Sequence, residues 1–428
     1  QRGGDVEVIT ESGIEFCAGG PDQFLHRSRV PFRKRACLQF IEEITHPLQR
    51  RLRLVEGIEG EHLGLSVAAQ IKDYDPRTPL KAWQRDKTIL HSDRYSWLAA
   101  AAADQAIKQS TLELPLSNPY RAVCIIGSAA GGQMSGERGA RDRFVDNKRA
   151  VHPMFLVRTI ASSAAAHVGI EYGVKGATYA INSAGASAAH SISIGRDYIR
   201  RGQADIAIVG GADSLITYGA MLAAQALGLL SREGCYPFSA NRSGTVLAEG
   251  AGILVLEAER HAKARGAKIL AEICGTGLSS NASDMVTPNV AGMKDAMQTA
   301  LRDAHLMPSD IDYLNAHGSA TRSNDRAETL AIKEAFEEHA YTMAISSTKS
   351  MHGHGMGAAA AVEAIACIKA LETGHIPPTI GLYERDPECD LDYVANVKRV
   401  QDLQYVMSNS FALGGFNASL IIGRPRKQ

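Results

Sequence analysis

Short apolar runs alternate with longer segments rich in small residues along most of the chain, and this alternation indicates an α/β architecture. From about residue 92 the first half is expected to hold strands at 122–127, 177–182, 204–209 and 246–257. Helices are expected between them at 95–109, 160–172 and 186–201. Strand–helix–strand order of this kind predicts sheets layered against helices.

The second half repeats this order. Helices are expected at 293–304, 326–338 and 358–371, and strands at 311–315, 342–346, 406–409 and 419–422. A polar stretch at 262–266 reads as a break between the halves. We therefore divide the chain into an N-terminal half, 1–258, and a C-terminal half, 259–428.

Two strand–turn–helix units resemble each other within the chain. Residues 180–201 and 344–371 each run from a strand through a turn of small residues into a helix. This duplication suggests a two-fold internal repeat. A helix N-terminus carries unpaired N–H groups and a partial positive charge, and small residues let it lie deep in a core beside a reacting group.

The first 65 residues are harder to interpret. Val6, Val8 and Ile9 are expected to begin a strand that Gly13, Gly19 or Gly20 would turn. A helix is expected at 38–53, after a basic stretch at 27–35. That stretch is either a solvated face, the ordinary outcome for such charges, or a surface for a partner.

Composition narrows the classes of function. The 428 residues carry 46 basic and 46 acidic side chains, so the basic excess of a non-specific nucleic-acid binder is missing. Hydrophobic content of 45% excludes wholesale disorder. Seven scattered cysteines without a CxxC pair favour a reducing, cytoplasmic compartment over a disulfide framework or zinc ribbon. Neither a membrane span nor a signal peptide is expected, because no long uncharged apolar run and no charged-then-apolar leader is visible.

Three turns carry candidate chemistry. They are 315–321, which contains His317, 346–357, which contains Lys349, His352 and His354, and the Gly-containing turn 410–417. A metal site is not expected, because no acidic residue or Cys accompanies the paired His at a ligand spacing. The Ser-x-x-Lys at 346–349 lacks the other penicillin-recognising motifs, and the Gly spacing fits no nucleotide cradle. Considered without the other motifs, a histidine such as His317 is more often structural than catalytic.

Together these motifs identify a family. The chain resembles the elongating β-ketoacyl-acyl-carrier-protein synthases over about residues 66–424. The matching stretches are 237–252 (Pro-Phe-Ser-Ala-Asn-Arg-Ser-Gly-Thr-Val-Leu-Ala-Glu-Gly-Ala-Gly), Asn315-Ala-His-Gly, Ser347-Thr-Lys-Ser-Met, Gly353-His and 410–417 (Ser-Phe-Ala-Leu-Gly-Gly-Phe-Asn). The resemblance implies a thiolase-like fold, with duplicated βα halves in an α-β-α-β-α sandwich. It also implies decarboxylative Claisen condensation of malonyl-carrier protein with an acyl thioester, in fatty-acid or polyketide synthesis.

The resemblance also implies roles for residues. His317 and His354 would stabilise the enolate, and Lys349 would support them. Asp325, Glu328 and Glu363 would organise this network. Ser319 and Thr321 would bind pantetheine, with Phe411 and Leu413 also lining the substrate site. The backbone N–H groups of residues 185 and 413 would form an oxyanion hole. The protein would need no cofactor of its own, because substrates arrive on the phosphopantetheine of acyl carrier protein.

Gly185 is the main departure, because the family carries its nucleophilic Cys there. A chain with Gly185 cannot form an acyl-enzyme, and Ser183 and Ser187 do not occupy the nucleophile's position. One explanation is a substitution in an active synthase. The other is a naturally non-nucleophilic member, either a chain-length-factor-like partner subunit or a malonyl-carrier-protein decarboxylase. Because His317, His354 and Lys349 are all retained, we favour a substitution in an active synthase.

Smaller departures and partner surfaces complete the comparison. Leu413 stands where many relatives place a gating Phe, and Glu11 replaces a usual Gly near the start. Lys81, Arg85 and Lys87 are candidates for docking the acidic carrier protein, although ordinary surface charge also explains them. By resemblance the chain is expected to be a homodimer. The unaligned residues 26–64 leave room for a heterodimer.

Overall fold

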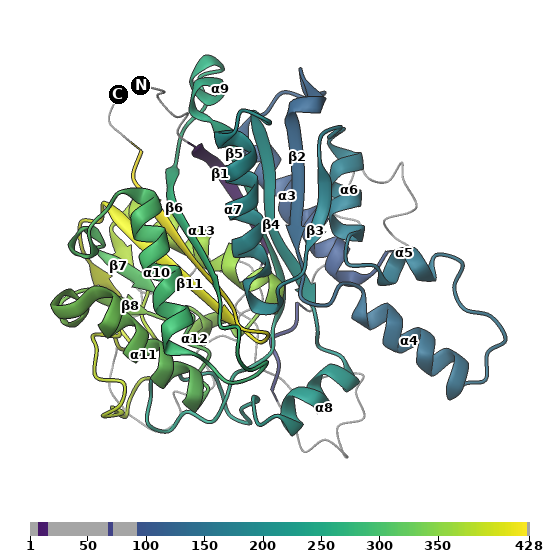
Figure 1. The fold of residues 1–428 in the computed structure, drawn as a ribbon. Helices are drawn as coiled ribbons and strands as arrows, with labels where there is room; N and C mark the ends of the chain where they lie inside the picture. The colour runs from purple at the N-terminus through teal and green to yellow at the C-terminus, as the bar shows by residue number, and fades with distance from the viewer. Residues whose placement is uncertain (1–6, 16–66, 72–91, 426–428) are drawn as a thin grey trace, which may run out of the picture.

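The computed structural model describes residues 7–15, 67–71 and 92–425 (Figure 1). The backbone alone is described for 7–15. The expected helix at 38–53, the basic stretch 27–35 and the docking candidates Lys81, Arg85 and Lys87 lie outside the described residues.

Within these described ranges, ten strands form one continuous mixed sheet. The first five are β1 (Glu7–Glu15), β2 (Ala122–Gly127), β3 (Thr178–Ile181), β4 (Ile206–Ser214) and β5 (Glu249–Ala258). The others are β6 (Ala271–Ser280), β7 (Tyr313–Asn315), β8 (Ala344–Ser346), β11 (Tyr405–Ala412) and β12 (Phe416–Gly423). Their spatial order is β3-β2-β4-β5-β1-β6-β12-β11-β7-β8.

The strand order shows the internal repeat directly. Within the N-terminal half the order is β3-β2-β4-β5-β1, and the equivalent strands of the C-terminal half run β8-β7-β11-β12-β6. The directions also agree. In each half the first three strands of this order are parallel, and the next two pair antiparallel. A short antiparallel pairing of β1 with β6 joins the halves, so equivalent strand ends meet in the middle of the molecule.

Helices pack on both faces and create five layers. α7 (Ser187–Arg200) and α13 (Ala359–Thr373) lie in the central layer, between the two halves of the sheet (Figure 1). α3 (Arg94–Ser110) and α6 (Ser163–Glu171) cover the outer face of the N-terminal strands. α10 (Val290–Ala304) and α11 (Arg322–Phe336) cover the outer face of the C-terminal strands. The result is the expected α-β-α-β-α sandwich.

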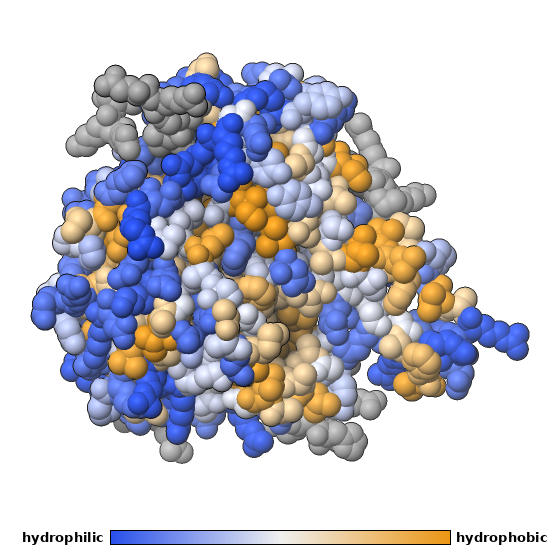
Figure 2. Space-filling model, viewed as in Figure 1, coloured by the Kyte–Doolittle hydropathy of each residue, from blue (hydrophilic) through white to orange (hydrophobic). Residues whose placement is uncertain are grey.

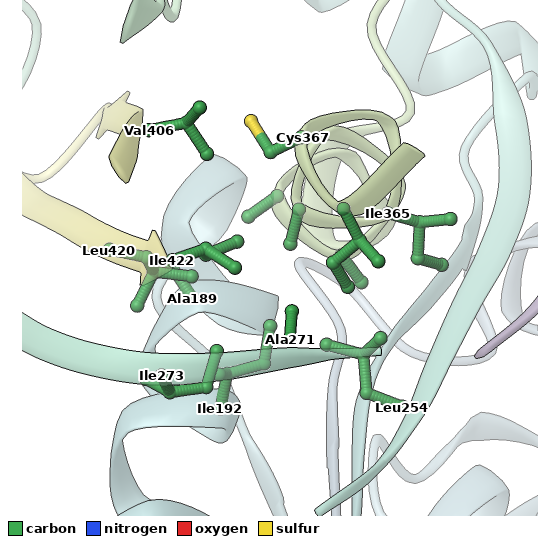
Figure 3. Close-up of a cluster of buried hydrophobic side chains, with 14 of the residues drawn as sticks. Ala189, Ile192, Leu254, Ala271, Ile273, Ile365, Cys367, Val406, Leu420 and Ile422 are labelled. Carbon is green, nitrogen blue, oxygen red and sulfur yellow. The ribbon is translucent and has the colours of Figure 1, made fainter. Parts of the chain in front are cut away.

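Small residues let the central helices lie close to the strands. Figure 3 shows Ala189 and Ile192 of α7 and Ile365 and Cys367 of α13 within one cluster of buried hydrophobic side chains. A Cβ added at Gly252 of β5 would lie 2.9 Å from the Ala361 side chain, so only Gly fits there. Each buried Ile of this core contributes about 1.5–3 kcal/mol relative to an exposed one. The Gly-rich, Ala-rich composition is therefore a packing requirement.

The periodic elements were predicted well and the irregular ones were not. β2 matches its expected range, and α3, α7 and α13 match within a few residues. Gly13 does not turn the chain, because β1 continues through it to Glu15 with a bulge between Ile9 and Ser12. The polar break at 262–266 is also wrong in part, because α9 (Glu259–Ala264) covers its start.

Several elements were missed altogether. α4 (Gln133–Phe144), α5 (Phe155–Thr159) and α8 (Tyr218–Ala226) extend away from the layers (Figure 1). β6 was missed because its sequence, Ala-Glu-Ile-Cys-Gly-Thr-Gly-Leu-Ser-Ser, is polar and Gly-containing, although its first half is buried. The remaining short elements among the described residues are α12 (Lys349–His352), β9 (His375–Ile376), β10 (Arg399–Val400) and five 3-10 helices of three to five residues.

Candidate active site

Gly185 lies in the turn between β3 and α7. The turn is a short 3-10 helix (Ala184–Ala186), and Ala184 adopts a left-handed conformation with φ of 48°. Gly185 itself is buried, at the entrance of α7. A Cβ placed on Gly185 would lie 3.3 Å from Cε1 and 3.4 Å from Nε2 of His354, and 3.7 Å from Cβ of Ala412. A side chain at this position would therefore emerge directly beside the His354 imidazole.

His317 lies just beyond the end of β7 and is buried. Its backbone N–H donates to Oε1 of Glu328 at 2.8 Å, which fixes the turn. The ammonium of Lys349 lies 3.3 Å from Nδ1 of His317 and forms a buried ion pair with Glu363. A lysine ammonium can only donate, so Nδ1 accepts and the ring hydrogen sits on Nε2.

His354 is held in the equivalent way in the turn before α13. Its backbone N–H donates to the carbonyl of Val246 at 2.7 Å, and its Nδ1 accepts from the backbone N–H of Met356 at 3.3 Å. The hydrogen of this ring is therefore also on Nε2. The centroids of the His317 and His354 rings are 5.3 Å apart, with the planes at 82°. Two neutral N–H donors thus meet beside Gly185.

Electrostatics keep both rings neutral. Burial lowers the pKa of His317 well below its usual range, and the charge of Lys349 and the neighbouring His354 add to this effect. Burial likewise lowers the pKa of His354, with Lys349 and His352 contributing. A neutral imidazole donates a hydrogen bond without giving its proton away. The pair is therefore suited to stabilising negative charge that develops on an oxygen.

Two buried carboxylates hold the His317 turn. Glu328 accepts from the N–H groups of His317 and Gly318, each at 2.8 Å. Asp325 accepts from the N–H of Phe238 at 2.8 Å, and its Oδ2 lies 3.6 Å from Nε of Arg242. Burial raises the pKa of Asp325 to about 6 and that of Glu328 to about 7. Burial also raises the pKa of Glu363 to about 7, against the opposing effect of Lys349.

Glu328→Gln is expected to gain stability relative to the parent chain as pH rises. The folded-state pKa of Glu328, about 7, exceeds the ordinary value of 4.5, so folding favours the protonated form. The free energy of unfolding of the parent chain therefore falls progressively between pH 4.5 and 7. The total loss is on the order of 3 kcal/mol, because each pKa unit corresponds to about 1.4 kcal/mol. Gln cannot ionise and escapes this cost. Urea unfolding of both chains at pH 5 and pH 7.5 measures the difference. If the difference in the free energy of unfolding between the two chains is the same at both pH values, the raised pKa of Glu328 is contradicted.

The expected pantetheine hydroxyls lie together. Ser319 Oγ and Thr321 Oγ1 are 3.0 Å apart, where the His317 turn enters α11. Phe411 is buried at the end of β11, with its ring centroid 6.2 Å from that of His317. Leu413 is 38% exposed in the turn that follows, next to the Ala412 side chain that faces Gly185. The structure therefore brings all of these candidates to one site.

The hydroxyls beside Gly185 are engaged elsewhere. Ser187 Oγ donates to the carbonyl of Ala184 at 2.7 Å and accepts from the N–H of Ser183. Ser183 Oγ lies 3.0 Å from Nδ1 of His190, but that nitrogen also faces the carbonyl of Ala186 at 3.0 Å. Because a carbonyl only accepts, Nδ1 of His190 carries hydrogen and cannot act as a base toward Ser183. Neither serine is an activated nucleophile.

Both ring nitrogens of His352 face partners in its own segment of the chain. Its Nδ1 faces the carbonyl of Gly353, and its Nε2 faces Thr348 Oγ1 at 3.1 Å. Among the described residues, no group of three or more His, Cys, Asp and Glu side chains is arranged to hold a metal ion. None of the helices within the described ranges has both the length and the apolar character needed to cross a membrane.

Sequence reasoning missed three residues that support the site. They are Asp213 and Ser128, at the ends of β4 and β2, and Arg242, whose Nη1 pairs with Asp386. A signal existed for Asp213, because it ends a continuous apolar strand after a Gly pair. Arg242 falls inside a motif that supported the resemblance, yet nothing in its spacing indicates its partners.

Comparisons with known proteins identify the family of the chain. Residues 53–262 match the family model "Beta-ketoacyl synthase, N-terminal domain", and 270–383 match "Beta-ketoacyl synthase, C-terminal domain". The chain is 45% identical to Nodulation protein E of Rhizobium leguminosarum bv. trifolii, over 78% of this chain and 83% of that one. It is 37% identical to 3-oxoacyl-[acyl-carrier-protein] synthase 2 of Coxiella burnetii, over 84% and 87%.

Solved structures give the same result. The ishigamide ketosynthase/chain length factor and a β-ketoacyl synthase from Burkholderia phymatum each superpose with a TM-score of 0.86 at 31% identity. Both alignments cover 99% of this chain and all of the other. The fold is therefore thiolase-like, as the strand order indicates, and the chain belongs to the β-ketoacyl synthase family.

Proposed function

We propose that this chain is a 3-oxoacyl-[acyl-carrier-protein] synthase scaffold that lacks its nucleophile. Its chemistry would be decarboxylative Claisen condensation of malonyl-carrier protein with an acyl thioester, in fatty-acid or polyketide synthesis. The observation that carries the proposal is the pair of Nε2–H donors on His317 and His354, 5.3 Å apart between ring centroids, beside a glycine with no side chain.

The two donors account for the decarboxylation step. When the malonyl carboxylate leaves as CO₂, the electron pair of the broken C–C bond moves into an enolate, and negative charge develops on the thioester oxygen. Two neutral N–H groups fixed before the reaction lower the barrier, because they need no reorganisation. Lys349 fixes the His317 tautomer by donating to Nδ1, and Glu363 compensates the buried charge of Lys349.

Gly185 limits the chain to this half of the reaction. Condensation needs an acyl group held as a thioester on a cysteine, which the enolate carbon attacks. Without that acyl group the enolate carbon instead takes a proton, and malonyl-carrier protein becomes acetyl-carrier protein plus CO₂. The chain would therefore be inactive in acyl loading but competent in decarboxylation.

Release of CO₂ from malonyl-carrier protein tests this proposal. We expect the chain as it stands to release CO₂ and acetyl-carrier protein in equal amounts, without becoming acylated. No release above the rate of malonyl-carrier protein alone, with a folded chain and a carrier protein that a related synthase accepts, would overturn the proposal. The assay needs no cofactor, because the substrate is carried on phosphopantetheine.

A chain-length-factor-like partner subunit is the second candidate function. Two solved relatives are named as ketosynthases with a chain length factor, one of them at 31% identity. A structural partner has no need for the His317, His354 and Lys349 set, so this candidate is the weaker one. Stable co-purification with a Cys-bearing relative, with no CO₂ release by this chain alone, would favour it.

The partners we propose are acyl carrier protein and a second copy of the chain. β3 is one of the two edge strands of the sheet, and within the described residues it pairs with β2 alone. Exposed apolar side chains lie near it, including Leu156 (75% exposed) on α5 and Ile170 (70%) on α6. Figure 2 shows apolar surface over α5 and also over α8. Apolar surface beside an open edge strand suits a dimer interface.

Aspartate at this surface is expected to weaken the dimer. A chain carrying Leu156→Asp and Ile170→Asp should shift from dimer to monomer at micromolar concentration, because two charges would be buried without partners. Both residues are exposed in the single chain, so its fold should persist. Light scattering after size exclusion measures the mass. Val400→Asp, at a 72% exposed residue of β10, is the matched control. An unchanged mass in the double variant would contradict the interface.

A further inference from the structure

Asp213 is a fully buried carboxylate that the chemistry above does not use. It lies near the end of β4, where its Oδ1 accepts from Ser128 Oγ at 2.7 Å. Its Oδ2 accepts from two backbone N–H groups, that of Ala129 at 2.7 Å and that of Gly357 at 2.6 Å. One side chain therefore joins the turn after β2, in the N-terminal half, to the turn after His354, in the C-terminal half.

The two turns approach at backbone contact. A Cβ added at Gly357 would lie 2.4 Å from Asp213 Oδ2 and 2.5 Å from the Ala129 nitrogen. A Cβ added at Gly211 would lie 2.2 Å from the Gly357 carbonyl oxygen. No side chain fits at either glycine, and the Asp213 carboxylate is hydrogen-bonded to both turns. Its position consequently sets their separation.

The Gly357 turn controls the His354 ring. Met356, the residue before Gly357, donates its N–H to Nδ1 of His354 at 3.3 Å. Met356 has a left-handed φ of 49°, which a non-glycine residue adopts only when its surroundings hold it. Anchoring Gly357 fixes the direction of the Met356 N–H. That N–H in turn keeps hydrogen off Nδ1 and on Nε2, the nitrogen that faces the Gly185 position.

We propose that Asp213 is the positioning residue for His354. Its carboxylate holds the 355–358 turn so that His354 presents Nε2–H to the reacting thioester oxygen. Asp213 itself does not touch the substrate. The catalytic part of this proposal rests on the proposed function, because it needs a thioester substrate. The orientation and tautomer of His354 can be measured in the chain without substrate, so the proposed function and the role of Asp213 can fail separately.

Asp213→Ala tests the proposal, and Glu257→Gln is its control. Glu257 is also a fully buried carboxylate, but it lies at the far end of the same strand pair, opposite Ile206 of β4, and pairs with Arg265. We expect Asp213→Ala to lower kcat for CO₂ release from malonyl-carrier protein by about 10–100-fold, because a misplaced catalytic group slows the chemical step. KM should stay within about threefold of the parent value, because carrier-protein binding does not depend on the His354 ring. Glu257→Gln should keep the parent kcat.

A spectroscopic readout makes the test independent of turnover. In chains with ¹⁵N-labelled imidazoles, the His354 signals, assigned with His354→Gln, should show an unprotonated Nδ1 in the parent. Asp213→Ala should move these signals toward a mixture of tautomers. Asp213→Asn should restore both the signals and kcat to within about fivefold, because its amide oxygen still accepts from Gly357 while its NH₂ donates to Ser128. Should the Ala variant fail to fold, Asp213→Ser, which admits water to the N–H groups, takes its place.

The opposite result is equally clear. If Asp213→Ala, or Asp213→Ser in its place, loses thermal stability but keeps the parent kcat and the parent His354 signals, Asp213 is merely structural and the proposal fails. If the parent itself releases no CO₂, the proposed function fails. The His354 signals then still decide whether Asp213 positions the ring.

Discussion

Gly185→Cys is expected to convert a chain that cannot be acylated into one that takes one acyl group per chain from acyl-carrier protein. The backbone at Gly185 lies outside the left-handed region, so an L-residue meets no strain there. The new Cβ would sit 3.3 Å from His354 and 3.7 Å from Ala412, close contacts that small shifts of these side chains can relieve. The thiol would also lie at the N-terminus of α7, where the helix dipole favours thiolate.

Intact-protein mass spectrometry measures this acylation. Gly185→Ala is the matched control, because it adds the same Cβ without sulfur and should stay unacylated. A Gly185→Cys chain that folds, binds carrier protein and still gains no acyl mass would show that residue 185 is not the nucleophile's position. Gly185→Ser should load far more slowly than Cys, because no base is placed beside it.

His317→Ala is expected to lower kcat for CO₂ release by about 10²–10³-fold, the cost of removing one preorganised donor at a developing oxyanion. KM for malonyl-carrier protein should change little, because the buried His317 offers almost no surface to the carrier protein itself. Radiometric or coupled CO₂ detection, with the fold checked by circular dichroism, measures the effect.

Lys349→Met gives a companion result. Met fills the same buried volume but cannot donate to Nδ1 of His317, so the His317 tautomer is no longer fixed and Glu363 loses its ion-pair partner. We expect a drop in kcat of similar order and a loss of stability, since breaking one side of a buried pair leaves an unpaired group. Full activity in either variant would remove the enolate-stabilising role assigned to this set.

The sequence predicts the fold well where its signals are periodic. Ala122–Gly127 is a continuous apolar run and forms β2 over its expected range, and the Ala-rich segment that ends at Gly374 forms α13. β6 and α4 were missed for a physical reason. The burial of β6 depends on a partner strand far along the chain, and α4 has no buried residue to give it an apolar stripe.

The candidate site was predictable through the order of its motifs. His317, Lys349 and His354 lie on different turns, and no spacing rule says that these turns meet. They meet because the duplicated halves bring equivalent strand ends together, where α7 and α13 begin. Asp213 could not be assigned a role in this way, because its partners Ala129 and Gly357 contribute only backbone N–H groups, which leave no trace in the sequence.

We infer that this chain holds a complete synthase site that lacks only the nucleophile at residue 185. Formation of 3-oxoacyl-carrier protein tests it most directly, with acyl- and malonyl-carrier protein supplied to the parent and to Gly185→Cys side by side. We expect CO₂ release by both chains and 3-oxoacyl product from Gly185→Cys alone. A folded, acylated Gly185→Cys chain that forms no 3-oxoacyl product would contradict it.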